Sequence, residues 1–297
     1  MIVTENYPVK NVHYKGFATD SIRWESFIPR DDDIFICTPY KCGTTWSQAI
    51  CASLIFRDPD HGKKPAMISP WVDSHLKSIE AMNQMLDNQT HRRFFKTHTP
   101  LDGIDYYPSC TYIAVYRDPR DTYFSLRNHI ENMNMDVPTT WMSEDVGESF
   151  RKWAAEPNVV GAAELFTLAE LVHHYRSFRK FSDLANVHFF HYSELKVDLN
   201  GQMQRLAQIL DVSIESELMS SLVEAAEFES MKKKAEQYVP ASGMEIWKDE
   251  GRFFHKGTSG QWLELSEEDL EFYYRCMGEL VVSEDLAWLQ GGTGLDK

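Results

Sequence analysis

Short apolar runs alternate with longer amphipathic segments along most of the chain. Four runs have the length and composition of buried strands and are bounded by turn-forming residues: 33–39, 93–98, 111–117 and 186–192. Elsewhere the apolar positions recur every three or four residues, which predicts helices. These helices are expected at 44–56, 75–88, 119–130, 164–181, 199–210, 215–228 and 266–281.

Strands that are separated by helices predict a parallel sheet covered on both faces, which is a three-layer α/β fold. The segments 57–71, 132–147 and 231–262 are expected to be mostly loop. No repeat, low-complexity block or linker divides the sequence. We therefore expect one domain over residues 1–297.

Composition narrows the class of partner. The net charge of −15 argues against nucleic-acid binding and against docking on an anionic membrane, because both need a basic face. No run approaches the roughly 18 apolar residues that span a bilayer. The five cysteines lack metal-ligand spacing, and the N-terminal residues lack an apolar signal core. These features predict a cytoplasmic protein with reduced thiols and no bound metal.

The stretch TPYKCGTTW (38–46) joins the first predicted strand to a helix. Backbone N–H groups of Cys42, Gly43, Thr44 and Thr45, at a positive helix end, are suited to binding an anion. The alternative is a plain turn with threonine caps. It is not a nucleoside-triphosphate P-loop, because its lysine, Lys41, precedes the glycine.

Further polar residues follow the other predicted strands. Lys96 and His98 are two positions apart, so their side chains leave the same face of a strand. Arg117 ends another strand, and Ser125 lies two turns along the next helix. Ligands of parallel sheets bind at the carboxyl ends of the strands, so we expect these groups to share one rim.

Four segments resemble motifs of the cytosolic-type sulfotransferases, in the family's order. TPYKCGTTW is similar to the family's TYPKSGTTW, with Pro39 and Tyr40 in reversed order and Cys42 in place of serine. FFKTHTP (94–100) is similar to KTHLP, and YRDPRDTYFSL (116–126) is similar to RNPxDxxxS. FFHKGTSGQW (253–262) is similar to RKGxxGDW, with His255 replacing the arginine.

The resemblance implies a P-loop NTPase-like sulfotransferase fold and transfer of a sulfuryl group from 3′-phosphoadenosine 5′-phosphosulfate (PAPS). It implies His98 as the general base, with Lys41, Lys96 and Ser125 as further catalytic residues. The implied nucleotide-binding residues are Lys41, Cys42, Gly43, Thr44, Thr45, Trp46, Arg117, Ser125, Tyr192, Phe228, His255, Lys256 and Gly257.

The acceptor is expected to be a small, partly apolar alcohol or phenol, with site walls from 57–92, 132–160 and 236–250. The insert 132–142 is interpreted as a lid over that site. Two alternative functions stay open: a P-loop-type nucleotide kinase, and a non-catalytic nucleotide-binding protein. The family's dimerisation stretch is absent after Trp262, so a homodimer is also left open.

Overall fold

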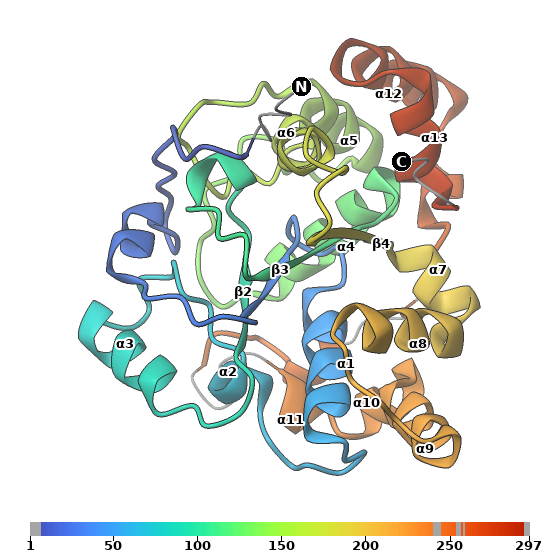
Figure 1. Ribbon diagram of the computed structural model, residues 1–297. Helices are drawn as coiled ribbons and strands as arrows, with labels where there is room; N and C mark the ends of the chain where they lie inside the picture. The colour runs from blue at the N-terminus through green and yellow to red at the C-terminus, as the bar shows by residue number, and fades with distance from the viewer. Residues whose placement is uncertain (1–6, 240–244, 254–256, 258, 294–297) are drawn as a thin grey trace, which may run out of the picture.

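A four-stranded parallel sheet forms the centre of the molecule (Figure 1). The computed structural model describes residues 7–239, 245–253, 257 and 259–293. The strand order is β2-β1-β3-β4, and the strands are β1 (Ile34–Cys37), β2 (Phe94–Thr97), β3 (Thr111–Tyr116) and β4 (Val187–His191). The predicted parallel α/β architecture is confirmed.

The strands place mostly aromatic side chains on one face and mostly aliphatic ones on the other, because successive residues of a strand point in opposite directions. Phe35 and Tyr112 are paired in register across β1 and β3, and their rings stack with centroids 4.7 Å apart. Ile34 and Ile36 of β1 lie in the core on the opposite face. Each face therefore has its own buried core.

Helices cover both faces, as Figure 1 shows. The aromatic face is covered by α3 (Ile79–Asp87), α4 (Pro119–Asn132), α5 (Val146–Ala155), α6 (Leu168–Arg179), α12 (Glu267–Leu280) and α13 (Ser283–Gly291). The aliphatic face is covered by α1 (Thr44–Phe56), α2 (Pro65–Ile68), α7 (Tyr192–Val197), α8 (Leu199–Ile209) and α9 (Ser216–Ala226). Shorter helical segments are α10 (Phe228–Lys233), α11 (Ala235–Tyr238), η1 (Ser21–Ser26), η2 (Leu101–Gly103), η3 (Glu250–Phe253) and η4 (Gln261–Glu264).

Local sequence explains where the main helices begin. The Asp118 side chain accepts the Arg120 N–H and caps α4, whose first residue is a proline that has no N–H to satisfy. Ser266 and Asp269 form a reciprocal capping box at the start of α12. These caps stand where the sequence pattern predicted the two helices.

Four predictions about elements are wrong in part. The expected loops 57–71 and 231–262 contain α2, α10, α11, η3 and η4, and α5 and α13 were not predicted. The helix expected over 164–181 begins only at Leu168, because Glu164 and Phe166 have positive φ angles of 63° and 54°. The helix expected over 215–228 ends at Ala226, because Glu227 is extended with ψ of 144°. Among the described residues, no helix is both long and apolar enough to traverse a bilayer.

Candidate active site

The carboxyl ends of the strands open into a cavity of about 370 Å³. Most of the predicted site residues line it: Lys41, Gly43, Thr44, Thr45, Trp46, Lys96, His98, Arg117, Ser125, Tyr192, Phe228 and Gly257. The side chain of Cys42 does not line it, and His255 and Lys256 lie outside the described residues. Residues that are far apart in the sequence thus line one cavity, as expected for residues that follow the carboxyl ends of parallel strands.

The loop between β1 and α1 turns through two left-handed residues, Lys41 with φ of 65° and Gly43 with φ of 107°. A Cβ atom at Gly43 would lie 3.1 Å from the Tyr192 ring, so both backbone angle and space favour glycine. The first N–H groups of α1 have no partner within the helix, and they face this turn. The loop is therefore shaped to hold an anion.

Cys42 corrects one detail of that prediction. Its N–H donates to the Pro39 carbonyl, 3.4 Å away, so it is directed into the loop and not toward the cavity. Its thiol is buried 3.6 Å from the Thr122 hydroxyl, and burial raises its pKa to about 11. Cys42 fills the core beneath the loop as a neutral thiol.

Two half-buried lysines line the cavity wall, Lys41 and Lys96. Burial, followed by the charges of Arg117 and Lys96, lowers the pKa of Lys41 to about 8. Burial likewise lowers the pKa of Lys96 to about 8, and its Nζ lies 4.7 Å from the centroid of the Trp71 ring. Both shifts have the sign expected when cations are desolvated without an anion between them. An anionic ligand would satisfy both amines.

His98 has a defined tautomer. Its Nδ1 lies 2.7 Å from the Thr38 carbonyl oxygen, which can only accept, so Nδ1 carries the proton. Nε2 then keeps its lone pair. Burial and the nearby Lys96 charge hold the pKa of His98 well below its ordinary value, so the ring is neutral near pH 7. A neutral imidazole with a free Nε2 is the state that a general base requires.

One face of α4 contributes four polar residues to the cavity: Ser125, Asn128, His129 and Asn132. Their spacing of three, four and seven positions is that of a single helical stripe. The Nζ of Lys41 lies 3.2 Å from Nδ1 of His129, and burial followed by the Lys41 charge holds the pKa of His129 well below its ordinary value. His129 was missed, although its position four residues after Ser125 on a predicted helix was a usable signal.

Aromatic residues form the end of the cavity that the sequence assigned to adenine. Trp46 donates its indole N–H to the Ala226 carbonyl over 2.8 Å, and its ring meets Tyr192 edge-on with centroids 5.2 Å apart. The guanidinium of Arg117 lies 4.6 Å above the Tyr192 ring. The rings are thus fixed beside a cation.

Gly257 approaches Phe228 closely. A Cβ atom there would lie 2.6 Å from the Phe228 ring, and φ is 60°. Two nearby cations, Arg252 and Lys248, could supply the charge of the motif's missing arginine, and Arg252 lines the cavity. Lys248 instead donates to the Glu131 carbonyl at the end of α4, 2.9 Å away.

The opposite end of the cavity is apolar. The segments predicted as walls contribute Trp71, Leu76, Met133, Met135, Ile246 and Trp247. The Asn134 N–H donates to the Ile246 carbonyl over 2.8 Å, so the insert 132–142 is paired with another wall segment. Phe17 and Phe166 also line this end and were not predicted, because neither belongs to a motif.

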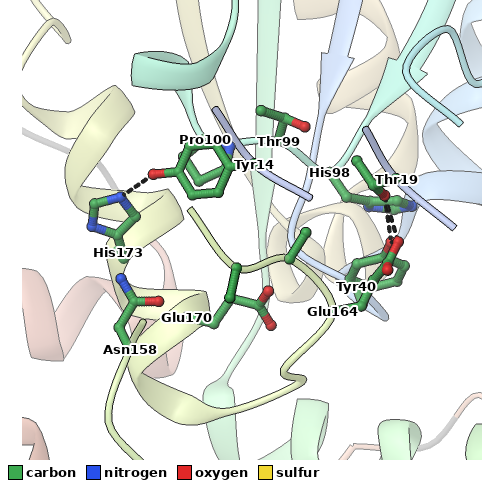
Figure 2. Close-up of a pocket in the computed structure, with 12 residues that line it drawn as sticks. Tyr14, Thr19, Tyr40, His98, Thr99, Pro100, Asn158, Glu164, Glu170 and His173 are labelled. Atoms are coloured by element: carbon green, nitrogen blue, oxygen red, sulfur yellow. Dashed lines mark hydrogen bonds between the residues drawn. The ribbon is translucent and has the colours of Figure 1, made fainter. Parts of the chain in front are cut away.

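A second, much smaller pocket of about 10 Å³ adjoins His98 (Figure 2). Its walls include the carboxylates of Glu164 and Glu170. Burial raises the pKa of Glu170 to about 7. A pocket of this volume accommodates about one water molecule.

Comparison with known proteins shows the family of this chain. The family model described as "Sulfotransferase domain" matches residues 31–281. The glycolipid sulfotransferase of Mycobacterium bovis is 33% identical, and the alignment covers 99% of this chain and 98% of that protein. The chain belongs to the sulfotransferase domain family and is a sulfotransferase.

Solved structures agree in fold. Mouse sulfotransferase SULT7A1, complexed with PAP, has a TM-score of 0.69 and 20% identity, and covers 93% of this chain and 95% of its own. Retinol dehydratase, in complex with androsterone and the inactive cofactor PAP, has a TM-score of 0.70 and 18% identity. The match covers 91% of this chain and 88% of that protein. The parallel α/β core is therefore that of known sulfotransferases.

Proposed function

We propose that the protein transfers a sulfuryl group from PAPS to a hydroxyl of an amphipathic acceptor and releases adenosine 3′,5′-bisphosphate (PAP). The observation that carries this proposal is the cavity itself, because a neutral histidine, two half-buried lysines and an anion-shaped loop all line it. Membership of the sulfotransferase family removes the nucleotide-kinase alternative.

The donor end would hold PAPS through its charges. The α1 N-terminus and Lys41 would bind the 5′-phosphosulfate, and Arg117 with Ser125 would bind the 3′-phosphate. Tyr192, Trp46 and Phe228 would enclose the adenine. His255 and Lys256 remain predicted ligands of the 3′-phosphate. Binding to a second phosphate would distinguish PAPS from ATP, which lacks one at that position.

The transfer step uses three side chains. Nε2 of His98 takes the acceptor's hydroxyl proton while the acceptor oxygen attacks sulfur in line with the bridging oxygen. The bond from sulfur to the bridging oxygen breaks, and its electron pair stays on the departing 5′-phosphate of PAP. Lys41 and Lys96 stabilise that developing negative charge, an electrostatic contribution that is large in a buried site.

The acceptor end favours a molecule with a substantial apolar part. Trp71, Phe166, Trp247 and two methionines surround it, and polar groups gather near His98 and along α4. Relatives such as the Mycobacterium bovis protein are named glycolipid sulfotransferases. We therefore propose an acceptor hydroxyl on a lipid-linked sugar or on another alcohol or phenol with a large apolar portion.

The experiment is a turnover assay with sulfur-labelled PAPS against a panel of glycolipids, long-chain alcohols, sterols and phenols. We expect transfer to at least one amphipathic class, and a loss of about 10² to 10⁴ in kcat for His98→Ala. Lys248→Met, whose amine is bound outside the cavity, is the matched control. PAP binding without any His98-dependent transfer would instead support the non-catalytic alternative.

A further inference from the structure

An aromatic ring lies flat against the proposed base. The Tyr40 ring is stacked on the imidazole of His98, with centroids 3.9 Å apart and an interplanar angle of 23°. The Tyr40 hydroxyl donates to Oε1 of Glu164, 3.1 Å away. Figure 2 shows these three side chains together at one end of the small pocket. A carboxylate, a phenol and an imidazole thus form one continuous row.

Glu164 is a fixed anchor for this row. It is buried in a left-handed backbone conformation, and its carboxylate also accepts from the Thr19 hydroxyl and from the Ala18 N–H, 3.0 Å away. Phe166 meets the Tyr40 ring edge-on with centroids 4.9 Å apart. Tyr40 is therefore held on two sides and cannot slide off His98 without breaking these contacts.

The ring comes from the reversed dipeptide in the anion loop. The family motif TYPKSGTTW has proline directly before its lysine, whereas this chain has Tyr40 before Lys41. A proline at that place would offer no aromatic face to the histidine. The stack is thus a feature of this chain that the family motif does not supply.

Protonated His98 needs such support. During transfer the ring becomes an imidazolium in a buried site, where desolvation and nearby cations oppose its charge. The face of an aromatic ring attracts cations, and most strongly when both are desolvated. Burial and the Glu164 charge raise the pKa of Tyr40 well above its ordinary value, so Tyr40 remains a neutral donor. Its bond to the carboxylate makes the ring more electron-rich.

We propose that Tyr40, polarised by Glu164, stabilises the imidazolium that His98 forms when it takes the proton of the acceptor hydroxyl. Tyr40 and Glu164 are positioning residues in this account, because they act through His98. The inference rests on the proposed function, since it needs His98 to gain a proton. It adds no reactant: the proton moves from the acceptor oxygen to Nε2, and PAP leaves with the electron pair.

Other charges also face His98 and must be separated from this effect. Lys96 on β2, Lys41 in the loop before α1 and His174 on α6 disfavour its protonation. The carboxylates of Glu164 and Glu170 favour protonation across the small pocket, whose far wall also carries Tyr14 and His173 beside Asp102. The His98 midpoint in variants of Tyr40 and Glu164 must therefore be compared with the midpoint in variants of the neighbouring residues.

The test is a nuclear magnetic resonance titration of His98 in the PAP complex, with the signal assigned by His98→Gln. Tyr40→Leu removes the ring face and should lower the midpoint by up to about one pH unit, a tenfold loss of proton affinity. Tyr40→Phe and Glu164→Gln should each give a smaller shift in the same direction. In Tyr40→Phe, adding Glu164→Gln should lower the midpoint by less than it does in the wild-type protein, because only the direct charge of Glu164 acts once the linking hydroxyl is gone.

Controls separate this role from a merely structural one. Tyr14→Leu removes another tyrosine of the small pocket that does not stack on His98, and it should leave the midpoint unchanged. Once an acceptor is known, the acidic limb of kcat/KM should shift with the His98 midpoint in Tyr40→Leu and should shift less in Glu170→Gln, which removes a charge but leaves the stacked ring in place. An unchanged His98 midpoint in a folded, PAP-binding Tyr40→Leu overturns the inference and leaves the proposed function intact. Failure to bind PAP at all would instead count against the proposed function.

Discussion

At the scale of single residues, the two half-buried lysines of the cavity lose their protons only slightly above neutral pH. Each has a pKa of about 8, lowered mainly by burial. Binding of an anionic nucleotide favours the charged amines and raises both values. Between about pH 8 and the raised pKa values of the complex, both lysines are protonated when the nucleotide is bound and largely deprotonated when it is not. Nucleotide binding there must take up protons.

We predict that PAP affinity weakens above about pH 8, because the lysines of the free protein lose their protons there. Calorimetry in buffers of different ionisation enthalpy should measure proton uptake of one to two per complex above this pH. Lys41→Met should remove about half of the uptake, and Lys248→Met should leave it unchanged. Binding without proton exchange at alkaline pH would show that the lysines do not contact the nucleotide.

At the scale of elements, the N-terminus of α1 depends on Gly43. Its φ of 107° is strained for any residue with a Cβ atom, and that atom would press on the Tyr192 ring. We predict that Gly43→Ala lowers the free energy of unfolding by about 1–2 kcal/mol and weakens PAP binding at least tenfold. Chemical denaturation and calorimetry measure both.

Gly278 provides a matched control for that substitution. It lies within α12, and a Cβ atom there would meet nothing within 4 Å. Gly278→Ala should therefore raise stability by about 0.5–1 kcal/mol and leave PAP affinity unchanged. Equal effects of the two substitutions would mean that the loop tolerates a side chain and that its left-handed turn is not required.

The elements that carry the site could be predicted because their signals are local. A buried strand precedes and a helix follows the motifs at 38–46 and 116–126, so β1 with α1 and β3 with α4 follow from the sequence within a few residues. Among the elements that were missed, α13 has apolar residues that do not gather on one helical face, and it is held by burial of Trp288 and Leu289. Contacts such as Tyr40 with Glu164 join residues 124 positions apart, and no local pattern encodes them.

The insert 132–142 illustrates the same limit. Its composition suggested a lid, and Met133 and Met135 do line the cavity. The pairing of Met133 with Trp247 and of Asn134 with Ile246 depends on chain segments more than 100 residues apart. Closure on binding stays a prediction that hydrogen exchange can address.

At the scale of the whole molecule, the protein has a net charge of −15, but its cavity is lined by four cationic side chains: Lys41, Lys96, Arg117 and Arg252. The cations repel one another across the empty cavity, so an anion that bridges them should stabilise the fold. We predict that PAP at 100 times its Kd raises the free energy of unfolding by about 2.7 kcal/mol. AMP at the same concentration should add far less, because it lacks the second phosphate.

A thermal melt with PAP, AMP and no ligand compares these states at fixed ionic strength. The difference between the two nucleotides should shrink in Arg117→Met if Arg117 binds the second phosphate. Equal stabilisation by PAP and AMP in the wild-type protein would mean that the cavity does not recognise a bisphosphate.

If the proposed sites are right, the polar stripe of α4 connects the nucleotide with the acceptor. From Ser125 to Asn132 it extends about 10 Å along one helix, at about 1.5 Å per residue, from the proposed nucleotide end of the cavity toward the proposed acceptor end. A tilt of α4 that widens the proposed acceptor end of the cavity must also displace the residues at the proposed nucleotide end. Attempts to retune acceptor choice by altering this helix should therefore carry a penalty in cofactor recognition, whereas changes in the opposing walls should not.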